Sequence, residues 1–519
     1  MELLYLCLRR LNVIGAFREL GTDNQRRGTL IALASTQLLV QLSSMPIALT
    51  IPSVARHYEI EVSQAAWMVI IRLLLLGSTV FLAARLGQKY GHVKVYFAGA
   101  ITMCVASTLS ALALDFNQLI VWSGAVGVGG ALITANSNAI LALVFDSNER
   151  GRAYSIPVVA ARFGSLIGLA LFGLFLQLGF IFPAFESYGW RLVFLTSLPV
   201  GLLAIKTSWP LLQFNFKDVV EEAKTISIDY VGASLMVATL GVFILSGLHI
   251  HDGAEAFTTP EAMGYHLPMH LLFLAMLGLF MVIQQRSRTP FVDFSYFKVK
   301  YFSTALYSNT TFHLSMLAVT TLIPIVVENG LGKAPWVVTM VLLPNQIMGL
   351  FLPPLAGWVY DRYNPKWLRP GSLMSIALGF ILVGFFAGGV PVWGLPLLMA
   401  PAYLGSNLFN TANNALVMNT LPQDRSFASG MLETTRQMGH TIGATIGATV
   451  LGLAIPITID LLPAIESQAL YREGFRYSAL AVVGIMVSGS VVAMFQKATD
   501  DNTTTTPTKP AAMHQAGND

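Results

Sequence analysis

Long apolar stretches separated by short polar segments follow one another from residue 28 to residue 495. Most stretches hold roughly 20 residues, the length that an α-helix needs to cross the hydrocarbon core of a bilayer. All of them must be helices, because an open sheet edge or a bare loop leaves backbone groups unpaired in lipid. The pattern predicts about fourteen spans, at 28–55, 65–86, 95–114, 119–143, 153–180, 190–208, 229–250, 267–284, 301–327, 335–359, 368–389, 392–417, 428–458 and 475–495.

Composition supports a membrane protein. The chain has 519 residues, of which 54% are hydrophobic and 11% charged, whereas soluble domains carry about a quarter charged residues. One soluble core cannot bury so much apolar surface, so the lipid bilayer is the expected partner. Basic residues are scattered along the chain and the net charge is only +4, which argues against a nucleic-acid partner. No metal-ligand spacing or catalytic triad is present, so we expect neither an enzyme nor a bound cofactor.

Charge asymmetry predicts the orientation. With the N-terminus inside, most of the 31 lysines and arginines fall on inside segments, as expected for loops that stay in the cytoplasm. The outside segments carry only Arg56, Arg191, Lys333, Arg472 and Arg476. We therefore expect a multi-pass protein of the inner (plasma) membrane with both termini cytoplasmic.

Three motifs occur twice, in the same order, at a lag of about 275 residues. The pairs are Ala84–Gly91 with Gly357–Asn364, Thr134–Ala139 with Thr411–Ala415, and Arg162–Gly168 with Arg436–Gly443. The repeat predicts two parallel six-helix halves with a binding site between them near the membrane midplane. Spans seven and eight are left over as an inserted hairpin.

This organisation predicts seven segments. They are a cytoplasmic N-terminal segment (1–27), an N-terminal six-helix bundle (28–208), a cytoplasmic loop (209–228), the inserted hairpin (229–284), a second cytoplasmic loop (285–300), a C-terminal six-helix bundle (301–495) and a disordered cytoplasmic tail (496–519).

Several motifs resemble the major facilitator superfamily, in particular its fourteen-helix drug:proton antiporter branch. Gly357-x-x-x-Asp361-Arg362 is similar to the family's loop motif, and Ala428-Ser-Gly430 with Arg436-Gln437 is similar to its thirteenth span. The resemblance covers about residues 28–495. It implies an all-α integral membrane fold of two six-helix bundles plus a hairpin, and secondary active transport by alternating access. It assigns gating or structural roles to Gln88, Lys89, Gly91, Asp361, Arg362, Arg436 and Gln437.

The first half departs from this family pattern. Gln88 stands where the family loop has an aspartate, and Ser43 stands where drug antiporters of the branch usually have an acid. The remaining departures are His92, Ser123 and Leu169. Features tied to proton-coupled drug export are therefore missing there, which leaves the coupling ion open.

Two arginines within spans are candidates for substrate binding. Arg72 lies about five residues deeper than the interfacial Trp67, roughly 7–8 Å into the membrane. A buried guanidinium usually faces a cavity or a partner and binds carboxylates or phosphates bidentately; the alternative is that Arg72 snorkels to the headgroups. Arg162 could bind substrate or tie helices near the inner gate, with Glu433 or a backbone carbonyl as a partner.

Four further polar residues lie in apolar spans. They are Asn309, His313, Asn345 and Gln346. We include them as candidates for substrate binding, although a lone histidine is more often a packing residue. His313 has the further interest that an unperturbed histidine titrates near physiological pH.

Three functions compete. The first is export of amphipathic or drug-like molecules driven by the proton gradient, with a periplasmic adaptor protein as a partner still to be tested. The second is transport of an anionic metabolite or a carboxylate-type siderophore, with Arg72 as the counter-charge. The third, a receptor or scaffold that does not transport, fits the polar residues of both halves least well.

Overall fold

The computed structural model describes residues 13–21, 23–43, 50–60, 62–181, 189–213, 229–247, 260–287, 290–333, 336–454 and 462–495. Within these ranges the chain is helical and contains no strand. The helices of the N-terminal part are α2 (Val13–Glu19), α3 (Asn24–Leu42), α5 (Ile51–Tyr58), α6 (Val62–Tyr90), α7 (His92–Ala111), α8 (Phe116–Val144), α9 (Arg150–Ile181), α11 (Gly189–Leu195) and α12 (Ser197–Ser208). Those that follow are α14 (Tyr230–Gly247), α15 (Pro260–Arg286), α16 (Lys300–Ile325), α17 (Trp336–Tyr363), α18 (Leu368–Phe386), α19 (Leu395–Thr420), α20 (Arg425–Ala454) and α21 (Ala464–Met494).

Nine helices within the described ranges are long and apolar enough to cross a membrane, and the apolar stretch Tyr230–Ser246 of α14 is shorter. An all-helical, multi-span membrane protein is thus confirmed, while the count of fourteen spans stays a prediction. The expected continuous span 28–55 is wrong, because α3 ends at Leu42 and α5 begins at Ile51. Pro52 lies in the first turn of α5, where a proline without an N–H favours the start of a helix.

The helices pack into two groups. In the first group, α3–α12, α3 packs on α9 and α12, and α8 packs on α6 and α7. In the second group, α16–α21, α20 packs on α16, and α18 packs on α19 and α21. The groups meet where α6 contacts α20 and where α9 contacts α17. The helices α14 and α15 pack on each other, and α14 also contacts α6 and α20.

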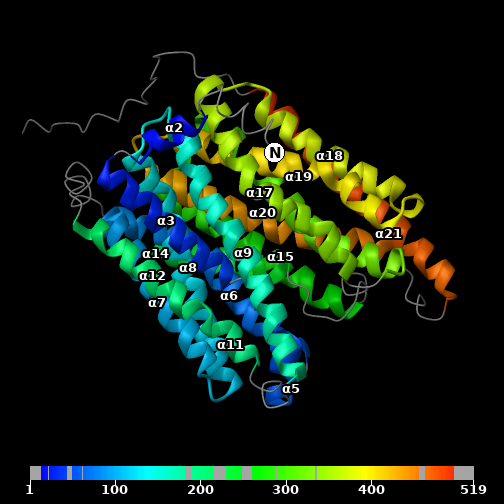
Figure 1. The fold of residues 1–519 in the computed structure, drawn as a ribbon. Coiled ribbons are helices and arrows are strands. Elements are labelled where there is room, and N and C mark those ends of the chain that lie inside the picture. The colour runs from blue at the N-terminus through cyan, green and yellow to red at the C-terminus, as the bar shows by residue number, and fades with distance from the viewer. Residues whose placement is uncertain are drawn as a thin grey trace, which may run out of the picture.

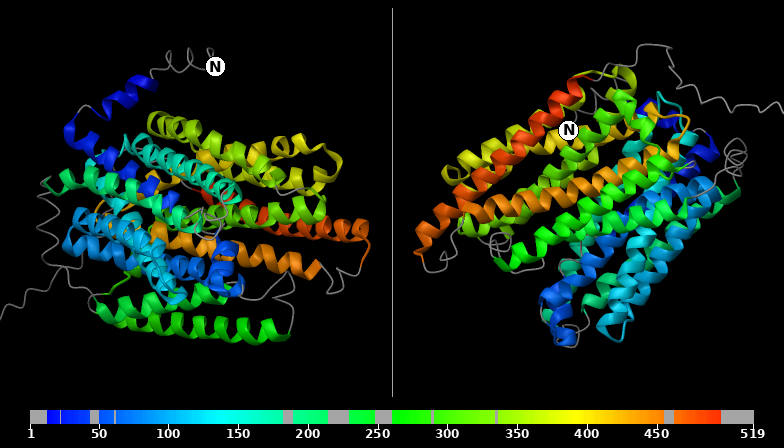
Figure 2. Two further views of the ribbon diagram at one scale, coloured as in Figure 1. Left: turned by 60° about the horizontal axis from the view of Figure 1, so that its bottom comes forward. Right: turned by 180° about the vertical axis from the view of Figure 1, so that it is seen from behind.

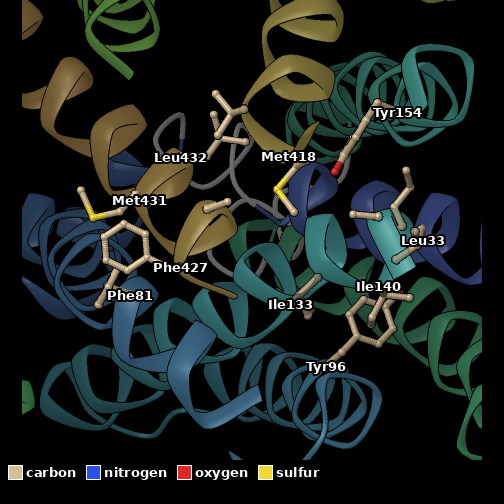
Figure 3. Close-up of a cluster of buried hydrophobic side chains, with 14 of the residues drawn as sticks. Leu33, Phe81, Tyr96, Ile133, Ile140, Tyr154, Met418, Phe427, Met431 and Leu432 are labelled. Atoms are coloured by element: carbon tan, nitrogen blue, oxygen red, sulfur yellow. The ribbon is translucent and has the colours of Figure 1, made fainter. Parts of the chain in front are cut away.

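The two groups converge at one end and diverge at the other. Near α2 their helices lie close together, whereas α5 and the start of α21 lie at the tips of separate arms (Figures 1 and 2). A shared apolar cluster lies where the groups meet, with Phe81 and Ile133 from the first group and Phe427 and Leu432 from the second (Figure 3). The rings of Phe81 and Phe427 are 5.7 Å apart in an edge-to-face arrangement. Burial of these side chains favours the converged arrangement.

Three predicted segments lie wholly or partly outside the described residues. The tail 496–519, the greater part of the loop 209–228 and the first twelve residues of the segment 1–27 belong to ranges that the structure does not describe.

Candidate functional site

The carboxylate of Asp361, near the end of α17, binds the N-terminus of α9 across the boundary between the groups. Its Oδ1 accepts from the backbone N–H of Gly151 at 2.8 Å, and its Oδ2 accepts from the backbone N–H of Arg152 at 2.9 Å. The Nε of Arg152 adds an ion pair at 3.0 Å, and the Asp361 side chain is 4% exposed. Helix N-termini carry unpaired N–H groups and partial positive charge, so this carboxylate links α17 to α9.

Two glycines permit this approach. A Cβ on Gly357 would clash with the backbone of Gly151, and a Cβ on Gly151 would clash with the carboxylate of Asp361. The motif Gly357-x-x-x-Asp361 therefore combines a close helix contact with a helix cap. Arg362, the other gating candidate of this loop, is exposed.

A second junction lies at the N-terminus of α20. Here the carboxylate belongs to Asp424, directly before the helix, and its Oδ1 accepts from the backbone N–H of Phe427 at 2.9 Å. The first group supplies Arg85, whose Nη1 pairs with Oδ2 of Asp424 at 3.1 Å. Gln88 accepts from Arg85 at 2.6 Å and donates to Asp424 at 3.5 Å. Gln88 therefore lies at the boundary, and the charges come from two residues, Arg85 and Asp424, that the sequence analysis did not single out.

The other candidates of the first loop lie beside this junction. The Nζ of Lys89 donates to the hydroxyl of Tyr230 on α14 at 3.2 Å, so Lys89 ties α6 to α14. Gly91 has a φ of 98° directly before α7, a conformation that favours glycine. His92 bonds Asn136 of α8 at 2.8 Å and Ser426 of α20 at 3.0 Å, and so adds a neutral link between the groups.

Arg162 of α9 reaches across the boundary to α17 and α19. Its Nη1 donates to Oε1 of Gln346 at 3.0 Å, and its Nη2 to Oδ1 of Asn407 at 3.4 Å. Asn407 donates to Oδ1 of Asn345 at 2.9 Å. Three sequence candidates thus share one cluster, together with Asn407, which the analysis missed. No acidic side chain pairs with Arg162 within the described ranges, so neutral amide oxygens hold this cation.

Asn309 and His313 lie elsewhere, where α16 packs on α20. The amide of Asn309 donates to the carbonyl of Leu432 and to the hydroxyl of Thr435, both at 3.0 Å. His313 Nδ1 lies 3.2 Å from Nε2 of His440. The structure therefore gives the apparently isolated histidine a second histidine as its neighbour.

Arg436 and Gln437 belong to the same helix, α20. The Nη1 of Arg436 pairs with Oε2 of Glu433 at 3.3 Å, so Glu433 is the partner of Arg436 and not of Arg162. The other oxygen of Glu433 accepts from Asn138 of α8 at 3.0 Å. Gln437 lies against Gly77 of α6, where α20 meets that helix. A Cβ added to Gly77 would lie only 3.4 Å from the Cβ of Gln437.

Arg72 is separate from these clusters. Its side chain is buried, with 4% of the residue exposed, which excludes extension to the lipid headgroups in this structure. The guanidinium donates to the backbone carbonyl of Ser43 at the end of α3. Arg72 therefore bonds within the first group at the point where α3 ends.

Some of the residues that sequence reasoning missed belong to a repeated motif that the sequence does show. Glu149-Arg150 at the start of α9 and Asp424-Arg425 at the start of α20 form a fourth repeated pair, which an extension of the repeat to the helix N-termini would have found. Arg150 is buried and bonds the side chain of Asn419 across the boundary. Glu433 was named only as a partner for Arg162, Asn407 belongs to no repeated motif, and His440 has no histidine counterpart in the first-half motif Arg162–Gly168.

Comparisons with known proteins agree with this architecture. A family model described as Major Facilitator Superfamily matches residues 33–444. The chain is 22% identical over 393 residues to "Riboflavin transporter RibZ" of Clostridioides difficile (strain 630), covering 76% of this chain and 81% of that protein. It is 23% identical over 417 residues to "Multidrug efflux pump LfrA" of Mycolicibacterium smegmatis (strain ATCC 700084 / mc(2)155), covering 80% and 78%.

Solved structures share the fold. The human organic anion transporter MFSD10 (TETRAN) aligns with a TM-score of 0.58 at 13% identity, covering 91% of this chain and 100% of that chain. The proton:xylose symporter XylE aligns with a TM-score of 0.55 at 14% identity, covering 89% and 95%. At these identities the likeness concerns the arrangement of helices alone.

Proposed function

Because the chain belongs to the Major Facilitator Superfamily, we propose that it exports amphipathic small molecules by alternating access, holding each molecule between its two helix groups. The family match confirms the resemblance seen in the sequence. The matched relatives are transporters, so the chain is a transporter and not an enzyme. Export is favoured because the relatives include a protein described as a multidrug efflux pump.

The substrate class is inferred from one observation. Arg162 of the first group is hydrogen-bonded to neutral amide side chains of the second group. A cationic molecule between these helices would meet a positive charge without an acidic partner, and the repulsion is amplified where the dielectric constant is low. A carboxylate, sulfonate or phosphate could instead displace the amides and take the bidentate geometry of the guanidinium. The preferred substrate therefore carries an anionic group, or is neutral with strong acceptors.

A second candidate function is transport of an anionic metabolite or a carboxylate-type siderophore with Arg72 as the counter-charge. It shares the requirement for an anionic group. Arg162 is better placed for this role than Arg72, because it bonds residues of both groups, whereas Arg72 bonds Ser43 within the first. A ligand held by Arg162 contacts both surfaces that alternating access moves apart.

The topology belongs to the same proposal. It comprises about fourteen spans, an inserted α14–α15 hairpin, the segment boundaries given above and two cytoplasmic termini in the inner membrane. The distribution of lysine and arginine supports it. A reporter fused after residue 495 should lie in the cytoplasm, and one inserted in 251–266 in the periplasm. The reverse result would refute the orientation.

The substrate class can be tested with two probes in proteoliposomes, radiolabelled benzylpenicillin as an amphipathic anion and ethidium as a cation. We expect the anion to be the better substrate. Arg162→Ala should lower its transport roughly tenfold or more, because hydrogen bonds to charged groups contribute about 1.5–3 kcal/mol. Arg162→Lys should fall between, since lysine keeps the charge and loses the planar fork.

The matched control is Arg56→Ala, which removes an exposed arginine that bonds Ser53 of its own helix and should leave transport unchanged. A thermal melt of each purified variant separates loss of affinity from loss of folding. Preference for ethidium, together with an unaltered Arg162→Ala variant, would show that Arg162 has only a structural role.

A further inference from the structure

Glu433 is an acid buried within α20, with 2% of the residue exposed. Its Oε1 accepts from the Nδ2 of Asn138 on α8 at 3.0 Å, so this oxygen links the second group to the first. Its Oε2 pairs with Nη1 of Arg436, one turn further along α20, at 3.3 Å. Both oxygens act as acceptors, which is the pattern of an ionised carboxylate.

Few charged or titratable side chains interact electrostatically with Glu433. Arg436 lies on its own helix, and Tyr154 of α9 is within electrostatic reach. The positive charge of Arg436 also interacts electrostatically with His313 of α16 and with His440 of α20. On the remaining helices that pack against α20, namely α6, α14, α19 and α21, no charged side chain of the described residues acts on Glu433. One arginine therefore holds the negative charge and lies beside two histidines.

This network leaves polar atoms unpaired. The Nε of Arg436 and the Nε2 of His313 are buried without a hydrogen-bond partner among the described residues. A buried donor or acceptor without a partner destabilises the arrangement that contains it. An arrangement in which Arg436 turned away from Glu433 could pair such atoms, so the network is suited to two states.

We propose that Glu433 is the proton-binding site that couples proton movement to the alternation between conformations. The proposal rests on the transport function proposed above and adds the identity of its coupling residue. The carboxylate takes up one proton on Oε2 from one side of the membrane and releases it to the other, and no other bond forms or breaks. In the protonated state Oε2 becomes a hydroxyl and the ion pair with Arg436 is lost.

The consequence for conformation follows from charge. With Glu433 neutral, Arg436, whose side chain is only 23% exposed, would lose its counter-charge, which is unfavourable for a partly buried cation. That state is relieved when the groups separate at this level and the guanidinium reaches water or an anionic substrate. Protonation therefore disfavours the converged arrangement seen here, and ionisation favours it.

The other acids with little exposed surface have different tasks. Asp361 accepts from the N-terminal N–H groups of α9, and Asp424 accepts from the N–H of Phe427 at the start of α20. Each caps a helix near the converging end. Glu433 has no such capping bond, and it joins side chains of both groups.

The test uses the full chain in lipid bilayers without any substrate. Infrared difference spectra between high and low pH should show the C=O band of a protonated carboxyl in the wild type. The Glu433→Gln variant should lose this band. Glu473→Gln removes an exposed acid that bonds Tyr477 and should keep it. Retention of the band in Glu433→Gln would overturn the proposal.

A second measurement follows the distance between the arms. Spin labels at Leu114→Cys and Ile465→Cys, introduced with Cys7 and Cys104 replaced by serine, lie on exposed positions, one shortly after α7 in the first group and one at the start of α21 in the second. Double electron–electron resonance should show a shift of the distance distribution with pH in the wild type and in Glu473→Gln. In Glu433→Gln the distribution should be the same at both pH values and match the low-pH form. A preserved pH response in that variant would likewise overturn the proposal.

Transport separates this inference from the function itself. Glu433→Gln should lose accumulation of radiolabelled benzylpenicillin driven by a pH gradient, while exchange of the probe without a gradient persists. If the wild type transports neither probe but Glu433→Gln still loses the infrared band and the pH response, the substrate class is wrong and the proton site stands. Loss of exchange and of gradient-driven transport to the same extent, with the infrared band unaltered, would assign Glu433 a structural role.

Discussion

Two of the junctions between the helix groups contain a carboxylate at a helix N-terminus, Asp361 in one and Asp424 in the other, and they place their charges differently. At the N-terminus of α9 the carboxylate comes from the opposite group, because Asp361 lies on α17. At the N-terminus of α20 the carboxylate of Asp424 belongs to the same segment as the helix that it caps, and the opposite group contributes Arg85 and Gln88. Both junctions keep an anion at a helix N-terminus, where the helix dipole favours it. They differ in which side supplies the negative charge.

This difference explains why Gln88 can replace an aspartate. At the α20 junction Asp424 already provides the anion, and a second carboxylate at position 88 would face it within hydrogen-bonding distance. Like charges at such separation repel. The neutral amide of Gln88 instead accepts from Arg85 and donates to Asp424. The family aspartate is therefore absent without loss of the junction.

The largest loss of transport should come from Asp361→Asn. The substitution keeps the size of the side chain but removes a buried charge that binds two backbone N–H groups and Arg152. Breaking a buried pair in this way costs about 3–5 kcal/mol, which should shift the protein away from the converged conformation. We expect transport of benzylpenicillin in proteoliposomes to fall at least roughly tenfold.

The control for this prediction is Asp146→Asn, which removes an acid that pairs with Arg26 at 3.4 Å and is 76% exposed. Exposed pairs contribute little to stability, so transport should stay near the wild-type rate. Similar losses in both variants would mean that the charge of Asp361 has no special part in closing this end.

An intermediate effect should follow Asp424→Asn. Asparagine can still accept from the N–H of Phe427 as a helix cap, so the loss is confined to the pair with Arg85, whose side chain is 12% exposed. We expect a cost of about 1–2 kcal/mol and a several-fold fall in transport. Adding Gln88→Asp to this variant should restore much of the activity, because it rebuilds the arrangement of the α9 junction with the carboxylate in the opposite group.

The comparison would be contradicted by a rescue that fails while both variants fold normally in a thermal melt. Gln88→Asp alone is the matched control. It should lower transport in the presence of Asp424, since the two carboxylates would then share Arg85.

Periodicity and composition were sufficient to predict an all-helical membrane protein, and the repeated motifs were sufficient to recognise the family. The division of 28–55 into α3 and α5 was not predicted. The apolar pattern continues through the break, so hydropathy alone cannot show it. Pro46 and Pro52 both lie within the predicted span 28–55, and neither was used there as a sign that the helix is divided.

Side-chain partners were harder to predict than elements. Arg162, Asn345 and Gln346 were all singled out, but nothing in the spacing showed that α9 faces α17 closely enough for Arg162 to reach Gln346. Hydrophobic periodicity defines the face of a helix and not its neighbour. Asp424 and Arg85 were missed for a different reason. The repeat was followed through the loops after α6 and α17, and was not extended to the helix N-termini that these loops contact.

The smallest effect should come from Gln88→Ala, which isolates the neutral part of the α20 junction. The substitution removes a bond of 2.6 Å to Arg85 and one of 3.5 Å to Asp424, while the ion pair between those two residues remains at 3.1 Å. A partly exposed hydrogen bond contributes about 0.5–1.5 kcal/mol, so transport should fall only about two- to tenfold, less than for Asp361→Asn. A double-mutant cycle with Asp424→Asn should give a coupling energy of similar size, because Gln88 and Asp424 share Arg85. If Gln88→Ala impairs transport as strongly as Asp361→Asn, the amide is essential to the junction, and the charge of the Arg85–Asp424 pair cannot be what holds the two groups together at α20.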